Sequence, residues 1–235
     1  VVELFPHPDL VKSLSRTKLK NQLIKLTDKN LSKMKGLKYA EQLLKLAQDS
    51  YPAVDSDSIQ VEEARYYCRL LIELTKQKEK VVKRMIATAQ EEETFQYYIS
   101  FPGIGAQTAA QLMGELGDIT RFDSGNQLNA YVGLDLNRYK SGNGGRQDHI
   151  NKRGNPIARK LLYFAVGNMI RQQHTAPNHI VDYYYRLRQK RPYPKLNKVA
   201  MVACMNKTLK CLLSMIKHHT KYRYRYTDSK STVKI

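Results

Sequence analysis

The sequence predicts a mainly α-helical protein, in which a long helix with a coiled-coil pattern precedes a compact helical domain. Between Ser58 and Ser100 there is no proline or glycine, and apolar residues recur at alternating spacings of three and four, as along the seam of a coiled coil. No segment shows the strong alternation of apolar and polar residues that is typical of a half-buried strand. With 235 residues, the chain is long enough for one or two domains with hydrophobic cores.

Glycine, proline and the apolar pattern divide the chain into four expected segments. These are a helical N-terminal segment over 1–57, a long coiled-coil helix or helical hairpin over 58–100, a helical domain over 101–220 and a basic flexible tail over 221–235.

Capping residues mark the helices expected within the third segment. Gly117 ends a helix that begins at Ala106, and Asn155-Pro156 provides an N-cap followed by a proline in the first turn. We therefore expect helices over about 106–116, 155–173, 179–190 and 196–218.

The net charge of +19 is concentrated in the C-terminal part of the chain. Of the 40 basic and 21 acidic residues, 18 of each lie in residues 1–137, which leaves 22 basic and 3 acidic residues in 138–235. A positive field of this size indicates a polyanionic partner, and nucleic acid is the commonest one. We expect no membrane partner, because no stretch approaches the ~18 consecutive apolar residues of a membrane span.

The cysteines and histidines do not predict a metal site. Cys68, Cys204 and Cys211 lack a C-x-x-C spacing, and none of the six histidines lies at ligand spacing from a cysteine or carboxylate. We expect the cysteines to be reduced, buried and structural.

The segment from Tyr98 to Leu112 has the pattern of a helix-hairpin-helix. Pro102 ends the first helix, and Gly103 and Gly105 permit a tight turn with exposed backbone amides, while Ile104 is expected to enter the core. Amides at a helix N-terminus suit a phosphate of a nucleic-acid backbone, so we expect Gly103, Ile104 and Gly105 to belong to the nucleic-acid contact. The alternative is a plain helical turn that binds nothing.

Ser141 stands in a glycine-rich and strongly basic segment. A serine hydroxyl is a weak nucleophile at neutral pH, and it needs a general base or a cationic site that stabilises charge on a phosphate under attack. No carboxylate–histidine pair nearby resembles a hydrolase triad. From composition alone, Ser141 is more often an ordinary loop serine. The expected nucleic-acid contacts in this part of the chain are Lys140, Gly142, Arg146, Lys152, Arg153, Arg159 and Lys160.

Several short motifs follow one another in order between Phe101 and Met215. They are Phe101–Gly105, Thr108–Ala110, Glu115–Phe122, Asn129–Leu134, Ser141-Gly142, Ile150–Asn155 with Arg159, and Val199–Leu209. This series resembles the C-terminal transposase domain of the Piv-invertase-like insertion-sequence family, the group of bridge-RNA-guided recombinases. The long preceding helix is similar to the coiled-coil segment of that family. Asn151, where the pattern often has serine, is a mild departure.

The resemblance implies a catalytic role for Ser141 and a further metal-binding domain. It implies that Ser141 is the nucleophile and forms a covalent phosphoserine link to DNA during strand exchange. It also implies an N-terminal RuvC-like domain with four acidic residues that bind a divalent metal. Residues 1–100 offer no such acidic set, so we expect no cofactor in this chain, Mg²⁺ in a domain outside it, and no DNA cleavage by the chain alone.

The expected partners are DNA, a structured guide RNA and further copies of the chain, bound through residues 58–90. The alternative for the apolar seam is packing against residues 9–50 of the same chain. We expect the protein in a prokaryotic cytoplasm, associated with the nucleoid. The alternative functions are a non-catalytic helix-hairpin-helix module that binds nucleic acid and a degenerate or truncated transposase.

Overall fold

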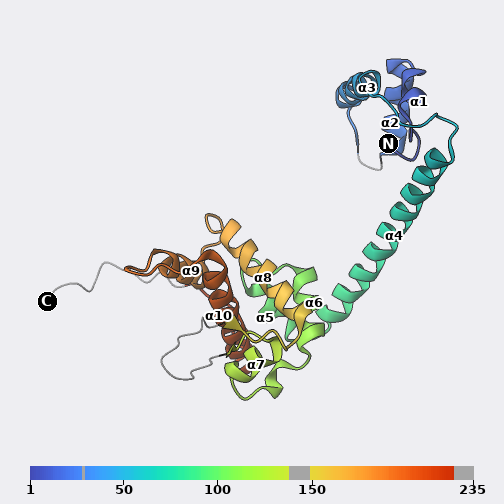
Figure 1. The fold of residues 1–235 in the computed structure, drawn as a ribbon. Helices are drawn as coiled ribbons and strands as arrows, with labels where there is room; N and C mark the ends of the chain where they lie inside the picture. The colour runs from blue at the N-terminus through green and yellow to red at the C-terminus, as the bar shows by residue number, and fades with distance from the viewer. Residues whose placement is uncertain (28–29, 138–148, 225–235) are drawn as a thin grey trace. The chain divides into compact units, whose positions relative to one another are not determined.

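The computed structural model describes residues 1–27, 30–137 and 149–224, and it is mainly helical, as the sequence predicts (Figure 1). The chain divides into two compact units, Val1–Val81 and Val82–Ile235, and the boundary lies within the long helix. Each unit has its own hydrophobic core.

The first unit is built on three helices, α1 (Pro8–Lys12), α2 (Arg16–Leu26) and α3 (Lys33–Gln48). Each is capped at its N-terminus by a side chain that accepts a hydrogen bond from a backbone N–H of the first turn. The buried side chains between them are those of Val11, Leu19, Leu23, Ala40 and Ala47.

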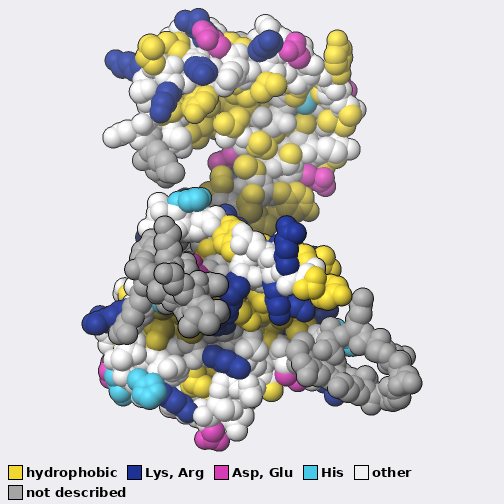
Figure 2. Space-filling view, turned by 90° about the vertical axis from the view of Figure 1, so that its left-hand side faces the viewer, with side chains coloured by type: hydrophobic (Ala, Val, Ile, Leu, Met, Phe, Trp, Pro, Cys, Tyr) yellow, Lys and Arg dark blue, Asp and Glu magenta, His cyan; other side chains and the backbone are white. Residues whose placement is uncertain are grey.

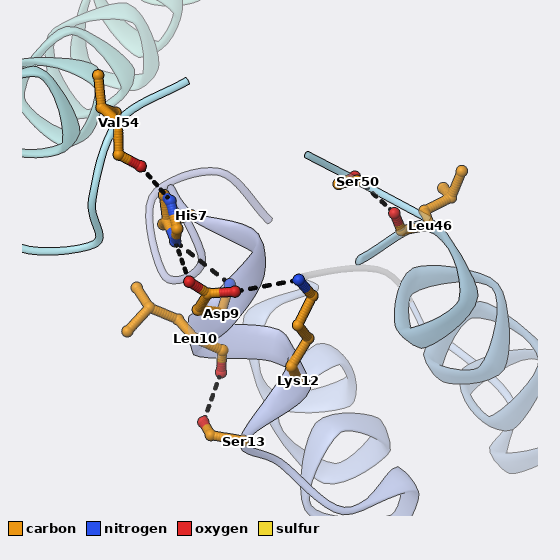
Figure 3. A network of polar contacts seen from close by, with 8 residues as sticks. All are labelled: His7, Asp9, Leu10, Lys12, Ser13, Leu46, Ser50 and Val54. Atoms are coloured by element: carbon orange, nitrogen blue, oxygen red, sulfur yellow. Dashed lines mark hydrogen bonds and ion pairs between the residues drawn. The ribbon is translucent and has the colours of Figure 1, made fainter. Parts of the chain in front are cut away.

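His7 ties α1 to the connector that follows α3 (Figure 3). Its Nδ1 accepts a hydrogen bond from the backbone N–H of Asp9 at 3.3 Å, and its Nε2 lies 3.0 Å from the carbonyl oxygen of Val54. Because Nδ1 is the acceptor, Nε2 carries the proton and donates to Val54. The imidazole is only 3% exposed, so both of its nitrogens are satisfied inside the unit.

The long helix α4 covers Ile59–Gln90 and is shorter than the expected segment 58–100. Glu91, Glu92 and Glu93 follow it directly, and negative charge is unfavourable at the C-terminal end of a helix. A second helix, α5 (Phe95–Ser100), begins after this acidic run.

The apolar seam of α4 consists of Ala64, Tyr67, Leu71, Leu74, Val81 and Met85. Its middle is exposed, whereas Ala64 and Met85 at its ends are half-buried. Leu71 is 65% exposed, Leu74 51% and Val81 64%. The structure therefore does not show the alternative in which this seam packs against residues 9–50. Self-association through it stays a prediction.

The second unit is formed by α5, α6 (Ala106–Leu116), the 3-10 turn η1 (Ile119–Arg121), α7 (Gly125–Val132), α8 (Pro156–Arg171), α9 (His179–Gln189) and α10 (Asn197–Lys217). Helix α10 packs against α7, α8 and α9. By length and composition α10 is apolar enough to cross a membrane, but ten of its side chains are buried within the unit, and it is the central core helix.

The capping residues behave as the sequence predicts. The Asn155 side chain accepts hydrogen bonds from the N–H groups of Ile157 and Ala158 at 2.9 and 3.0 Å, and Gly117 ends α6 with a φ of 61°. Helix α7 was not predicted, because its apolar run is short. Ser124 caps its start, and Gly133 ends it in the left-handed conformation.

The beginning of the expected flexible tail is packed against the second unit, which corrects that expectation for residues 221–224. The Tyr222 ring lies 4.4 Å from the Phe101 ring, centroid to centroid. Its hydroxyl accepts a hydrogen bond from the His179 backbone N–H at 2.9 Å, and its own backbone N–H donates to Ser100 Oγ at 3.0 Å. Residues 225–235 lie outside the described part of the chain.

A short antiparallel strand pair, β1 (Leu136–Asn137) and β2 (His149–Ile150), flanks residues 138–148. Three backbone hydrogen bonds continue the pairing beyond the strands. The N–H groups of residues 151, 152 and 155 donate to the carbonyl oxygens of residues 135, 133 and 131, at 2.9, 3.1 and 2.8 Å. We call β1, β2 and the paired segments 131–135 and 151–155 the loop base.

Gly154 makes the closest backbone approach in the loop base. A Cβ at this position would lie 2.2 Å from the carbonyl oxygen of Tyr131 and 2.3 Å from the backbone nitrogen of Gly133. Both atoms belong to the backbone, so neither can move aside as a flexible side chain would. Only glycine therefore fits at position 154.

We predict that Gly154→Ala lowers the free energy of unfolding of the second unit by more than about 2 kcal/mol, because the added methyl group forces two backbone segments apart. Gly114→Ala is the matched control. It lies within α6, a Cβ there meets no atom within 4 Å, and alanine is favoured over glycine in helices by about 0.5–1 kcal/mol. Thermal unfolding of the full chain measures both variants, with hydrogen exchange assigning the change to residues 131–160. Equal stability of the two variants would contradict this account of the loop base.

Candidate nucleic-acid interface

Four of the expected site residues, Lys140, Ser141, Gly142 and Arg146, lie outside the described residues, in the segment that joins β1 to β2. The loop base fixes where this segment leaves and re-enters the unit. The other expected residues belong to two places in the second unit: the turn between α5 and α6, and the stretch that runs from the loop base into α8.

The turn between α5 and α6 depends on Gly103. This residue has a φ of +84°, and a Cβ on it would lie 2.7 Å from Met169 Cγ and 2.8 Å from the Met169 backbone nitrogen. The turn is therefore pressed against α8, and Ile104, 4% exposed, enters the core as predicted. Asn168 of α8 adds a long hydrogen bond from Nδ2 to the Gly103 carbonyl oxygen at 3.4 Å.

Gly105 has a different role from the one expected. Its φ of −83° is open to any residue, and a Cβ there would meet no atom within 4 Å, so the turn does not require glycine at this position. As the N-cap of α6, however, Gly105 has no side chain to cap the helix. Gly105, Ala106 and Gln107 are exposed, and the first N–H groups of α6 are therefore open to an anion from outside.

An arginine that the sequence analysis did not single out lies beside this turn. The guanidinium of Arg171 donates a hydrogen bond to Oδ1 of Asn168, the residue that also bonds to the Gly103 carbonyl oxygen. Arg171 is exposed. The Asn168 side chain thus links a positive charge to the turn that precedes α6.

Lys152 and Arg153 are exposed at the end of the loop base. Lys152 has a φ of 60°, a left-handed conformation that costs a non-glycine residue roughly 1–2 kcal/mol. The hydrogen bond from its backbone N–H to Gly133 is part of what holds this conformation. Backbone conformations of this kind concentrate at functional sites.

Arg159 and Lys160 start on neighbouring positions of α8 but face different surroundings. One N–H group of Arg159, on Nη1, donates to the carbonyl oxygen of Val132 at 2.8 Å, so this side chain braces the loop base from the inside. Lys160 is exposed, and its Nζ lies 5.9 Å from the centre of the Phe164 ring. Of the two, Lys160 is the one available to a phosphate.

The carboxylates near the site are engaged in structural contacts. Oε2 of Glu115 accepts a hydrogen bond from Nδ2 of Asn155 at 2.8 Å. The hydroxyl and backbone N–H of Thr120 donate to Asp118 and lower the pKa of its carboxyl. Within the described residues, no group of three or more His, Cys, Asp or Glu side chains is placed to hold a metal ion.

Burial makes two cysteine thiols and one tyrosine hydroxyl of the second unit poor nucleophiles. Burial raises the pKa of the Cys204 thiol to about 12 and also raises that of Cys211, so both remain protonated at neutral pH. Burial likewise raises the pKa of Tyr222 to about 12. All three cysteines are free thiols, as expected. Cys204 is buried, whereas Cys68 and Cys211 are only half-buried.

A basic stretch that was not among the expected contacts covers the end of α9, the connector to α10 and the first residues of α10. Residues 186–198 contain six basic residues and no acidic one, a signal that was present in the sequence. Figure 2 shows Lys and Arg side chains among apolar ones on the viewed face of the second unit, with few acidic side chains near them. The positive charge of the unit is therefore not confined to the expected residues around Ser141.

Comparisons with known proteins show similarity to transposases. Residues 96–184 match the family described as Transposase IS116/IS110/IS902. The transposase for insertion sequence element IS1111A of Coxiella burnetii is 36% identical over 85 residues, which cover 36% of this chain and 23% of that protein. A probable family 20 transposase of Pseudomonas aeruginosa is 26% identical over 141 residues, which cover 60% of this chain and 40% of that protein.

The matched regions span less than half the length of both curated relatives. They nevertheless confirm the transposase part of the resemblance that the motifs indicated. The segment from 96 to 184, with the α5–α6 turn, the loop base and Ser141, is similar to the transposase domain of the IS116/IS110/IS902 family.

Proposed function

We propose that this chain is the part of an insertion-sequence transposase that binds DNA and supplies Ser141 as the nucleophile for strand exchange. The match of residues 96–184 to a transposase family is the observation that carries this proposal. The loop base supports it, because this structure anchors both ends of the Ser141 segment beside exposed Lys152, Arg153 and Lys160.

The chemistry we propose is a transesterification at phosphorus. Ser141 Oγ forms a bond to the phosphorus of a DNA phosphodiester, the bond from phosphorus to one deoxyribose oxygen breaks, and the serine proton ends on the departing hydroxyl. Attack by another deoxyribose hydroxyl reverses the step and rejoins the strand. Basic side chains around the phosphate stabilise the charge that develops on its oxygens.

The proposed protein needs partners that this chain does not supply. We propose that Mg²⁺ is held by an acidic, RuvC-like domain outside residues 1–235, and that a structured guide RNA selects the DNA. We expect such a protein in the bacterial cytoplasm, at the nucleoid.

A purely binding function is the second candidate. It is supported by the exposed first residues of α6, which has no side-chain N-cap, and by the exposed side chains of Lys152, Arg153 and Lys160, all of which can hold a phosphate without any reaction. In that case the open N-terminus of α6 and the basic side chains bind nucleic acid, and the hydroxyl of Ser141 has no role.

Ser141→Ala separates the two candidates. In a longer protein that includes the acidic domain, we predict that this change abolishes recombination and the covalent protein–DNA product, while the affinity for DNA changes less than about twofold, since one uncharged hydroxyl contributes little beside many charge contacts. Ser214→Ala, which removes an exposed hydroxyl from α10, is the control and should retain activity. Recombination that survives in Ser141→Ala would place the nucleophile elsewhere.

Binding itself should be steeply dependent on salt, because each neutralised phosphate releases counterions. We predict that replacing Arg153 and Lys160 together by alanine weakens duplex binding for all sequences and lowers the slope of log K against log salt by about 2, close to one unit for each lost phosphate contact. The control replaces Lys18 and Lys25, exposed on α2, and removes the same charge from the first unit. Titrations of a labelled duplex at several salt concentrations give both slopes, and equal slopes for the two double variants would place the interface elsewhere.

Self-association through the α4 seam is our third proposal. Leu71 and Leu74 expose apolar side chains along one helical stripe, and two such stripes bury each other in a coiled coil. We predict that Leu71→Glu with Leu74→Glu yields monomers in sedimentation. Lys76→Glu is the control: Lys76 is exposed on α4 but does not lie in the apolar seam, so this change should leave the assembly intact. A wild-type chain that is monomeric at high concentration would refute the proposal.

A further inference from the structure

A groove of about 550 Å³ lies in the second unit, separate from the α5–α6 turn. Strand β2, helix α9 and the first turns of α10 form its walls. Its floor is apolar and includes Leu134, Ile150 and Val202, and Lys195 and Lys198 stand at its edge. A volume of this size lies within the range of about 300–1,000 Å³ that is typical of small-molecule sites.

Two further cations lie close to Tyr183, one of the residues that line this groove. Lys207 Nζ lies 4.8 Å and Arg186 Cζ 5.2 Å from the centre of its ring. None of the residues that line the groove in the described structure is acidic. The groove therefore combines an apolar floor with a rim that attracts an anion.

A nucleotide has the complementary chemistry, with a flat, largely apolar base and a negative phosphate. Bases in an intact duplex are stacked and paired, so their faces cannot reach such a floor. A base that is unpaired can turn out of the stack and be held by apolar and aromatic side chains.

We propose that this groove binds a single unpaired nucleotide, with its base against the floor of Ile150 and Val202 and its phosphate near Lys195 and Lys198. This inference deepens the proposed function. It depends on one part of that function, the binding of nucleic acid, and not on the chemistry of Ser141. The unpaired nucleotide has two possible sources, a DNA strand that is opened during recombination and a loop of a structured RNA.

The test compares the affinity of the full chain for a paired duplex with its affinity for the same duplex carrying one bulged nucleotide, in a DNA series and an RNA series. We expect the bulged form of at least one series to bind about tenfold more tightly, because stacking and burial of a base add to the charge contacts. The series that shows this preference identifies the source of the nucleotide.

Variants then locate the preference. Val202→Trp and, with a smaller change, Ala203→Leu fill the groove and should reduce the ratio of the two affinities to about one while leaving paired-duplex binding unchanged. Lys195→Ala with Lys198→Ala should also reduce the ratio, whereas Lys210→Ala, exposed on α10 and not part of the groove wall, should not.

The proposal is overturned if neither series shows a preference for the bulge, or if the preference survives in both filled variants with unchanged thermal stability. Photocrosslinking supplies a readout that does not depend on those variants. An iodouracil placed in the bulge should attach to a groove residue such as Tyr183, and attachment only elsewhere would contradict the assignment. If the unsubstituted chain does not bind paired duplex at all, that result refutes the proposed function and not the assignment of the groove.

Discussion

The close approach of Gly154 to the backbone of Tyr131 and Gly133 is the constraint on which the candidate site depends. It allows residues 151–155 to hydrogen-bond along residues 131–135, and this pairing sets both ends of the segment that contains Ser141. The same contact places Asn155 where it caps α8 and bonds to Glu115 of α6. Removing the hydrogen in favour of a methyl group would thus disturb the loop, the start of α8 and the link to α6 together.

Side chains around the loop base divide into those that hold it and those that face outward. Arg159 and Asn155 are turned toward backbone and carboxylate partners inside the unit, whereas Lys152, Arg153 and Lys160 are exposed. A phosphate is stabilised best by charges that do not have to reorganise, so the residues that hold the loop base in place support the exposed basic side chains. An alanine scan that treats Lys152, Arg153, Arg159 and Lys160 alike as DNA contacts would confuse loss of binding with loss of structure, because Arg159 braces the loop base.

Local chemistry explains which features could be predicted from the sequence. Gly117 and Asn155 cap helices through contacts with residues a few positions away, so their roles were visible in the chain. The end of α4 was missed because only the charge of three glutamates marks it, and the fit of Gly154 against Gly133 was missed because it joins residues twenty-one positions apart through tertiary packing. The role of Gly105 was misassigned because a glycine that leaves a helix uncapped looks the same in sequence as one that a turn requires.

The central claim is that nucleic acid binds the second unit at the loop base and the start of α8. Hydrogen exchange of the full chain, measured with and without a DNA duplex, tests this most directly, because it reports protection along the whole chain without any substitution. The account predicts that duplex slows exchange in residues 149–160 and at the start of α6, residues 105–108, while residues 8–48 exchange as in the free protein. Protection confined to residues 8–48, with none at the loop base, would contradict it.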